Sequence, residues 1–171
     1  LKVGHKRYAF NVLEGTYRER PVCCFEYHYE TYSSDSKGRR QTHHHYLTAA
    51  AIHLPHGLGY LMVRPENIFD KLAGAVGFND IDFESVEFSR RFYVKSLDRK
   101  FAYDIIHART MEFLLHRVAR GFAFELAGPA LLLYNGARWR PEQVPDALDW
   151  LVEFVELIPD YVWHDAKEQG R

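Results

Sequence analysis

The feature that most constrains the fold of this chain is an aromatic, alternating pattern that occurs twice around a polar turn. The first segment runs from Val22 to Tyr32, the second from Thr42 to Thr48, and residues 33–40 between them are polar. Successive side chains of a β-strand point to opposite faces, and Ser, Asp and Gly favour turns. The pattern predicts a long two-stranded antiparallel ribbon. Most of the side chains that could bind a metal or another ligand lie at its far end.

Size and composition indicate one folded domain over residues 1–171. A chain of this length can bury a core without disulfides or structural metals. Hydrophobic residues make up 47% of the chain and aromatic residues 15%, which favours sheet surfaces and large core side chains. The net charge of −1 gives the molecule no general attraction to nucleic acid, so we expect no nucleic-acid partner.

The order of the predicted elements indicates the fold class. We expect an α+β domain with an antiparallel sheet of about six or seven strands, a long N-terminal meander and a C-terminal helix packed on the sheet. A pleckstrin-like roll with helical insertions is one version of this fold. The strands are expected over residues 7–13, 16–32, 41–54, 59–63, 88–95, 122–126 and 130–134, and the helices over residues 66–76, 98–119 and 145–158.

Several residues define the predicted helices. Asp98 is a plausible N-cap for the second one, which is expected either as one helix or as two helices bent near His107. The last helix should begin at Pro145, because a proline ring inside a helix clashes with the preceding turn, and it should end at Pro159. Its apolar stripe predicts that Leu148, Trp150, Leu151 and Val155 are buried.

Histidine and glutamate side chains lie close together near the end of the predicted ribbon. If Glu30 pairs with His43, then His28 faces His45, and all four side chains share one face. Imidazole and carboxylate groups are ligands that Zn²⁺ prefers. A zinc site at His28, Glu30, His43 and His45 is therefore one hypothesis. The alternative is a set of ordinary cross-strand pairs without a cofactor, because a shift of one residue would divide the group between both faces.

Basic residues gather at the same end of the ribbon. Lys37, Arg39 and Arg40 lie close in sequence to His43, His44 and His45, and together they could bind a phosphate or a lipid headgroup. The alternative is a solvated turn whose charges prevent edge-to-edge pairing of strands. The aromatic residues Phe25, Tyr27 and Tyr29 are expected to pack in the core or on the sheet rather than to stack on single-stranded nucleic acid.

Signatures of the common enzyme classes are missing from the sequence. There is no Gly-x-Ser-x-Gly elbow, no phosphate-binding loop and no His-Glu-x-x-His motif. Cys23 and Cys24 are adjacent and should point to opposite faces of a strand, so we expect two free thiols, which suits a reducing compartment such as the cytoplasm. The sequence contains no apolar run of about 18 residues, the length that would predict a transmembrane helix.

Five segments carry a resemblance to a known group of proteins. They are Arg64–Glu66, Asp70–Ala73, Asp82–Phe92, Phe101–His107 and Met111–Leu115. Together they resemble uncharacterised actinobacterial proteins that are often predicted to carry transmembrane helices before their soluble part, and they are loosely similar to a wider bacterial domain of unknown function. The resemblance covers most of the chain after Tyr17, and it departs from the family at Ala108, where a proline is expected.

The resemblance assigns no functional residue. It implies a soluble module tethered to the inner face of a membrane, with an anchor upstream of Leu1. Three hypotheses for the function follow. The first is a non-enzymatic interaction module that binds a protein partner or a membrane surface. The second is phosphate or headgroup binding through the basic end of the ribbon. The third is a metal-dependent enzyme or metal sensor. The sequence indicates no oligomeric state.

Overall fold

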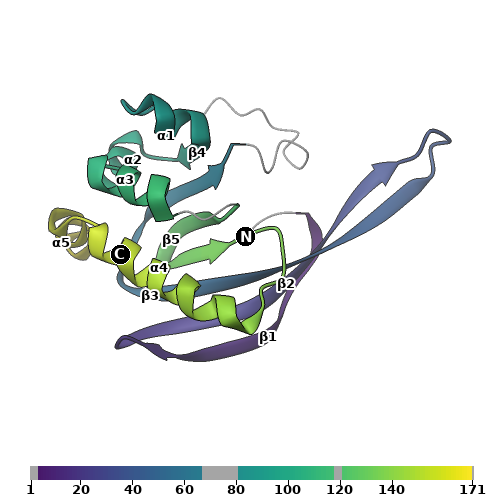
Figure 1. Ribbon diagram of the computed structural model, residues 1–171, viewed down its shortest axis with the longest axis horizontal. Coiled ribbons are helices and arrows are strands. Elements are labelled where there is room, and N and C mark those ends of the chain that lie inside the picture. Colours follow the sequence, from purple (N-terminus) through teal and green to yellow (C-terminus); the bar gives the residue numbers. More distant parts are fainter. Residues whose placement is uncertain (1–3, 67–80, 118–120, 171) are drawn as a thin grey trace.

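The protein is α+β, as expected, and its strands form one open antiparallel sheet (Figure 1). The computed structural model describes residues 4–66, 81–117 and 121–170, so the helix expected over residues 66–76 lies almost entirely outside the described residues. The strands are β1 (His5–Tyr17), β2 (Arg20–Ser34), β3 (Arg40–Pro65), β4 (Phe92–Ser96) and β5 (Ala123–Tyr134). The helices are α1 (Val86–Arg91), α2 (Arg99–Ile105), α3 (Ala108–Arg117), the short 3₁₀ turn η1 (Pro141–Gln143), α4 (Val144–Leu157) and α5 (Asp160–Glu168).

The long strand β3 organises the sheet. Residues 40–52 of β3 pair with β2, and residues 61–65 pair with β4. β5 pairs with residues 49–63 of β3, and β1 continues the sheet beyond β2. The described residues therefore form a sheet of five strands, where six or seven were expected. The difference arises because two pairs of expected strands are each one continuous strand.

The first merged strand is β3 itself. Pro55 was expected to break it, yet the strand continues from Arg40 to Pro65. Pro55 is exposed and lies between His53 and Leu58, where the register with β5 shifts and the ladder is interrupted. A proline has no N–H to give to a ladder, so it is tolerated in a strand at such a bulge.

The second merged strand is β5, where a hairpin around Ala127-Gly128-Pro129 was expected. Gly128 takes a φ of +58°, a left-handed conformation that costs glycine little. It pairs with Leu58 at the irregular part of β3, so both strands bulge at the same level of the sheet. A bulge bends a strand without ending it, and β5 therefore bends where the sequence indicated a turn.

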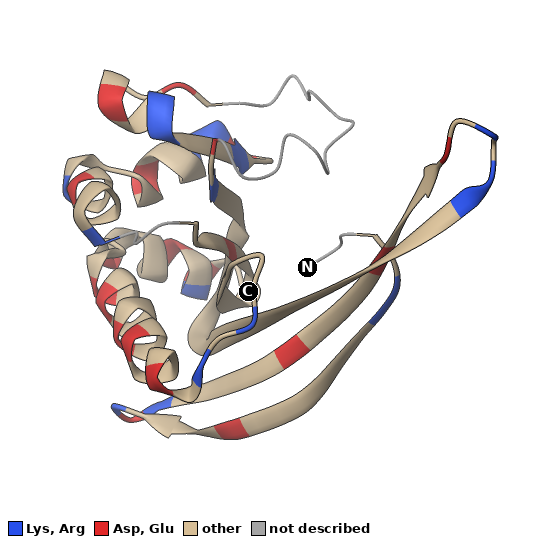
Figure 2. Ribbon diagram, turned by 45° about the vertical axis from the view of Figure 1, so that its right-hand side comes forward, with Lys and Arg blue, Asp and Glu red and all other residues tan. Residues whose placement is uncertain are grey.

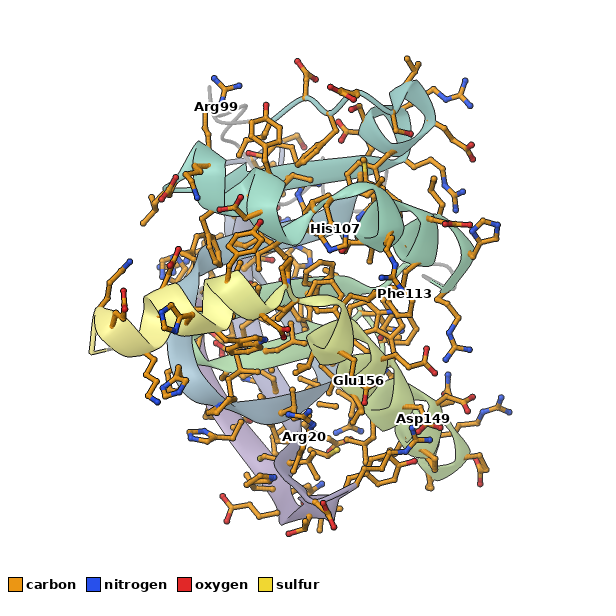
Figure 3. All side chains as sticks on the ribbon, turned by 90° about the vertical axis from the view of Figure 1, so that its left-hand side faces the viewer. Arg20, Arg99, His107, Phe113, Asp149 and Glu156 are labelled. Carbon is orange, nitrogen blue, oxygen red and sulfur yellow. The ribbon has the colours of Figure 1, made fainter. Side chains whose placement is uncertain are left out.

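The helices lie against one face of the sheet and form the main core with it (Figures 1 and 3). Leu151 and Phe154 of α4 are fully buried, and they belong to the same core as Ile52, Leu54 and Leu61 of β3. The burial predicted for the last long helix is confirmed, since the exposed fractions of Leu148, Trp150, Leu151 and Val155 are 8%, 5%, 0% and 4%.

Helix boundaries depend on polar caps. The Asp98 side chain accepts a hydrogen bond from the Phe101 N–H, which confirms it as the N-cap of α2. The helical stretch expected over residues 98–119 forms two helices, α2 and α3, which are separated by Ile106 and His107. A strand had been expected to begin at Phe88, but Ser85 caps α1 by accepting from the Phe88 N–H, and β4 begins only at Phe92.

The helical part of the chain continues beyond Pro159, where it was expected to end. α4 ends just before it, as expected, but α5 then begins at Asp160. Proline suits a helix start because the first N–H groups of a helix have no partner within it. Val162 and Ala166 of α5 are buried in the main core. None of the described helices is long and apolar enough to cross a membrane.

The N-terminal strands extend beyond the helices. We call β1, β2 and residues 40–48 of β3 the arm, because β5 pairs with β3 only from Ala49 onward. In Figure 1 the hairpin of β2 and β3 leads away from the helices, which lie at the other side of the molecule. The helix-covered remainder of the molecule is called the body.

Candidate functional site

The arm presents two different faces. On one face lie His28, Glu30 and Tyr32 of β2, opposite Tyr46, His44 and Thr42 of β3, with Tyr8 and Phe10 of β1 beside them. We call this the His28 face. Toward the body the same face of β3 continues into Ala50, Ile52 and Leu54 of the main core. The opposite Tyr29 face carries Tyr27, Tyr29, Thr31, Ser33, His43, His45 and Leu47.

The register of the hairpin differs by one residue from the expected one. Glu30 lies opposite His44 rather than His43, and His28 lies opposite Tyr46 rather than His45. The expectation that His43 and His45 share a face with His28 and Glu30 is therefore wrong. The structure brings His28 and Glu30 together as expected, but His44 completes the group.

The turn explains this register. Asp35 accepts hydrogen bonds from the backbone N–H groups of Lys37 and Arg39, at 2.9 and 2.8 Å. Gly38 takes a φ of +74°, and Ser34 then pairs with Arg40. Side-chain oxygens of Asp often fix turns in this way. The backbone N–H of Arg39 outweighs the burial of Asp35 and lowers the pKa of its carboxyl below the ordinary value.

Three side chains converge on the His28 face. The distance from His28 Nε2 to His44 Nδ1 is 3.1 Å, and that from His44 Nδ1 to Glu30 Oε1 is 3.7 Å. One ligand atom of each side chain lies within 4.8 Å of the other two. In the part of the chain that the structure describes, no other three His, Cys, Asp or Glu side chains converge this closely.

The carboxylate of Glu30 is held in one orientation. Its Oε2 accepts a hydrogen bond from the Tyr32 hydroxyl at 3.0 Å and lies 3.3 Å from Lys6 Nζ, while Oε1 faces His44. Burial favours the neutral acid, but the Tyr32 hydrogen bond and the Lys6 and His44 charges outweigh it and lower the pKa of the Glu30 carboxyl. Glu30 is therefore ionised at neutral pH although only 5% of it is exposed.

Aromatic rings hold His28 in place. The ring centroids of Tyr8 and Tyr46 lie 4.7 and 4.8 Å from that of His28, and His28 is 3% exposed. Its Nδ1 atom is buried without a hydrogen-bond partner among the described residues. His44 lies at the surface, since 54% of its side chain is exposed. The group thus has a buried side and one side that is open to solvent.

The rest of the His28 face is aromatic and partly exposed. Tyr8 is 52% exposed and Tyr46 is 42% exposed, with Phe10 between them in ring contact with both. Arg138 lies over the rings of Phe10 and Tyr46 and forms an ion pair with Glu26 at 3.1 Å. None of these residues was predicted from the sequence to belong to a binding site, although Tyr46 follows the two-residue alternation that His44 begins.

The Tyr29 face has a different character. Tyr27 and Tyr29 are buried, and Phe25 packs against their cluster, which confirms the expectation that these aromatic residues serve packing. His45 Nε2 is 2.8 Å from the Thr31 hydroxyl, and its ring stacks on Tyr29. Burial, together with the neighbouring histidines, lowers the pKa of His45. His43 Nε2 is 2.8 Å from the Ser33 hydroxyl.

The basic residues lie at the far end of the arm (Figure 2). Lys37, Arg39 and Arg40 are exposed, but two of them interact within the arm. Arg39 forms an ion pair with Asp35 at 2.9 Å, and the Arg40 guanidinium lies 3.5 Å from the centroid of the Tyr32 ring. Of the three histidines in the predicted binding set, only His44 shares a face with Arg40.

Two reactive side chains outside this group have structural contacts, since Cys24 packs against the main core and His107 contacts the end of α4. Cys23 and Cys24 are free thiols, and burial raises the pKa of both, which makes them poor nucleophiles at neutral pH. His107 Nε2 lies 3.0 Å from the Leu157 carbonyl oxygen and so joins α3 to the end of α4 (labelled in Figure 3). Among the described residues, the closest group of potential ligand side chains therefore lies on the arm.

Comparison with known proteins shows the fold but no family. No family model matches the chain, and no curated protein matches it. A solved structure with a similar fold is that of the mycobacterial trehalose monomycolate transport factor A, TtfA. The TM-score is 0.58 at 14% sequence identity, and the match covers 88% of this chain and 74% of that one. The chain is thus similar in fold to a mycobacterial transport factor.

Proposed function

We propose that this protein is a non-enzymatic interaction module that binds a protein partner through the His28 face of its arm. The observation that carries the proposal is the aromatic group of exposed Tyr8, half-buried Phe10 and exposed Tyr46, with the Arg138 guanidinium over the rings of Phe10 and Tyr46. Tyrosine and arginine dominate the binding energy of many protein interfaces. Because ring contacts already hold these side chains in place, binding would cost little side-chain entropy.

The backbone of β1 favours binding through side chains over the addition of a strand. Its pairing with β2 shifts register twice, between His5 and Tyr8 and between Phe10 and Leu13, and Lys6 and Asn11 adopt positive φ angles. Such irregularities distort an edge strand and hinder its pairing with another chain. We therefore place the partner on the exposed aromatic side chains rather than along the edge of β1.

The fold comparison supports the same class of function. The similar structure is named as a transport factor, and its mycobacterial origin agrees with the actinobacterial resemblance of the sequence. We propose that this chain has an accessory role in a transport process, close to the inner face of a membrane. A protein partner at that membrane is the occupant that we assign to the His28 face.

Photocrosslinking in the native host tests the proposal. A photoreactive phenylalanine analogue placed at position 46 should yield one adduct of defined mass, which mass spectrometry then identifies as a protein. The matched control is the same analogue at Tyr161 of α5, which is 49% exposed but lies in the body. The adduct at position 46 should disappear in a Tyr8→Ser background. Equal crosslinking at positions 46 and 161, or none at position 46, would reject the His28 face as the interface.

The basic end of the arm supports a second candidate function, the binding of phosphate or lipid headgroups. Lys37, Arg39 and Arg40 are all exposed at the point of the arm farthest from the body (Figure 2). Flotation with phosphatidylcholine vesicles, with and without phosphatidylserine, tests it. Binding should require the anionic lipid, weaken with added salt, and be lost when all three residues are replaced by Ala. Replacing Arg90 and Arg91 of α1 provides the control in the body.

A further inference from the structure

We propose that His28, Glu30 and His44 form a binding site for a divalent transition metal, with Zn²⁺ as the best fit. The chemistry of the three side chains suits this ion, because two imidazole nitrogens and one carboxylate oxygen form a set that Zn²⁺ binds in proteins. The site differs from the one expected from the sequence, since the hairpin register replaces His43 and His45 by His44. The inference does not depend on a partner at the aromatic residues.

The distances agree with a shared ion. Two ligand atoms that each lie about 2.0–2.2 Å from a tetrahedral Zn²⁺ are separated by about 3.3–3.6 Å. The separations are 3.1 Å between His28 Nε2 and His44 Nδ1 and 3.7 Å between His44 Nδ1 and Glu30 Oε1. The ligand atoms of His28 and Glu30 lie within 4.8 Å of one another, so an ion would draw these two atoms together as well as the exposed His44 ring.

The surroundings prepare the ligands for an ion. Tyr32 and Lys6 both contact Glu30 Oε2, which leaves Oε1 directed toward His44. Tyr8 and Tyr46 hold the His28 ring from its two neighbouring strands. Hydrogen bonds such as that from Tyr32, made to a ligand from outside the ion's own shell, orient metal ligands and support the affinity of natural sites. The ligands therefore lose little freedom on binding.

Burial supports a specific site over a chance surface group. His28 and Glu30 are 3% and 5% exposed, although each is a polar group for which burial is costly unless it is paired. The exposed side of His44 gives an ion a route from solvent. With three protein ligands, one position of a tetrahedral ion stays open to water or to another donor. The structure thus assigns an accessible site with one free coordination position.

Titration calorimetry with Zn²⁺ alone tests the site, in a Cys23→Ser/Cys24→Ser background that removes the thiols as competing ligands. We expect one Zn²⁺ per chain. His44→Ala should weaken binding at least about tenfold, because even the loss of an outer contact typically costs 10- to 100-fold. Glu30→Gln, which preserves the shape of the side chain, should weaken it similarly, and Tyr32→Phe should weaken it about tenfold.

His43→Ala is the matched control, because His43 is the neighbouring histidine and points to the Tyr29 face. It should leave the affinity unchanged. Zn²⁺ should also raise the melting temperature of the parent protein and of His43→Ala by the same amount, and that of His44→Ala by less at the same Zn²⁺ concentration. The absence of saturable binding, or equal losses in His43→Ala and His44→Ala, would overturn the proposal. Circular dichroism of each variant separates a lost site from a lost fold.

Discussion

The arm and the body use the same face of the same strand for opposite purposes. In the body, Ile52, Leu54 and Leu61 of β3 lie under the helices and are almost fully buried. In the arm, His44 and Tyr46 continue that face, but no helix of the described chain covers them, and both are exposed. Strand alternation sets which residues share a face, and the position of the helices sets whether that face becomes a core or a binding surface.

The two regions also bury polar groups in different ways. The main core of the body is built from apolar side chains, and its stability comes from apolar area removed from water. On the arm, the buried His28 lies against the rings of Tyr8 and Tyr46, and the buried Glu30 is paired with Lys6 and Tyr32. A region held by such contacts is expected to be less stable and more adaptable than the core.

The largest effect is expected in the body. Leu151→Ala removes a fully buried side chain from the core between α4 and the sheet. The free energy of unfolding should fall by about 2–5 kcal/mol, as for other packed leucines. Leu97→Ala, at a leucine that is 84% exposed, is the matched control and should cost less than about 0.5 kcal/mol. Equal losses for the two variants in urea denaturation would contradict the assignment of the core.

A second effect, also in the body, appears at high pH. Burial, followed by the charges of Glu125 and Tyr93, raises the pKa of Tyr60 to about 12. An unfolded tyrosine loses its proton near pH 10, so between about pH 10 and 12 the folded state keeps a proton that the unfolded state has lost. The free energy of unfolding should therefore fall across this window, by at most about 1.4 kcal/mol per pH unit. Urea denaturation at several pH values should show a smaller slope for Tyr60→Phe.

A moderate effect is expected where the arm joins the body. Tyr17 donates a hydrogen bond of 2.8 Å to Asp149 of α4, and Arg18 pairs with the same oxygen at 2.6 Å (Asp149 is labelled in Figure 3). Tyr17→Phe should lower the free energy of unfolding by about 0.5–1.5 kcal/mol. Tyr8→Phe is the control. Backbone hydrogen exchange near Tyr17 should become faster in Tyr17→Phe but not in Tyr8→Phe. An unchanged exchange rate there would mean that the arm is held mainly by its strand pairing.

The smallest effect is expected at the far end of the arm. Replacing Lys37, Arg39 and Arg40 by Ala should change the free energy of unfolding by less than about 0.5 kcal/mol, because exposed charges contribute little to stability. Hydrogen exchange should be fastest over residues 33–40 in the parent protein, since this polar turn projects beyond the paired strands. A loss above 1 kcal/mol in the triple variant would show that the arm depends on its basic end.

Local patterns predicted a large part of the fold. The ribbon followed from the alternation of its side chains, α4 from its apolar stripe and α2 from the Asp98 cap. Each of these signals lies within a short segment. The continuous strands β3 and β5 could not be found in this way, because Pro55 and Gly128 are tolerated only at a bulge that the two strands share. Whether a residue breaks a strand depends there on its neighbour in the sheet.

The candidate site shows the same division. The sequence by itself determined that imidazole and carboxylate groups would gather near the end of a ribbon, because strand pairing brings residues 28–30 close to residues 43–45. Only the tertiary structure decided which of them meet. The Asp35 turn sets a register in which Glu30 lies opposite His44, so that His44, rather than His43 and His45, shares the face of His28 and Glu30. A side-chain period of two makes every such shift a change of face.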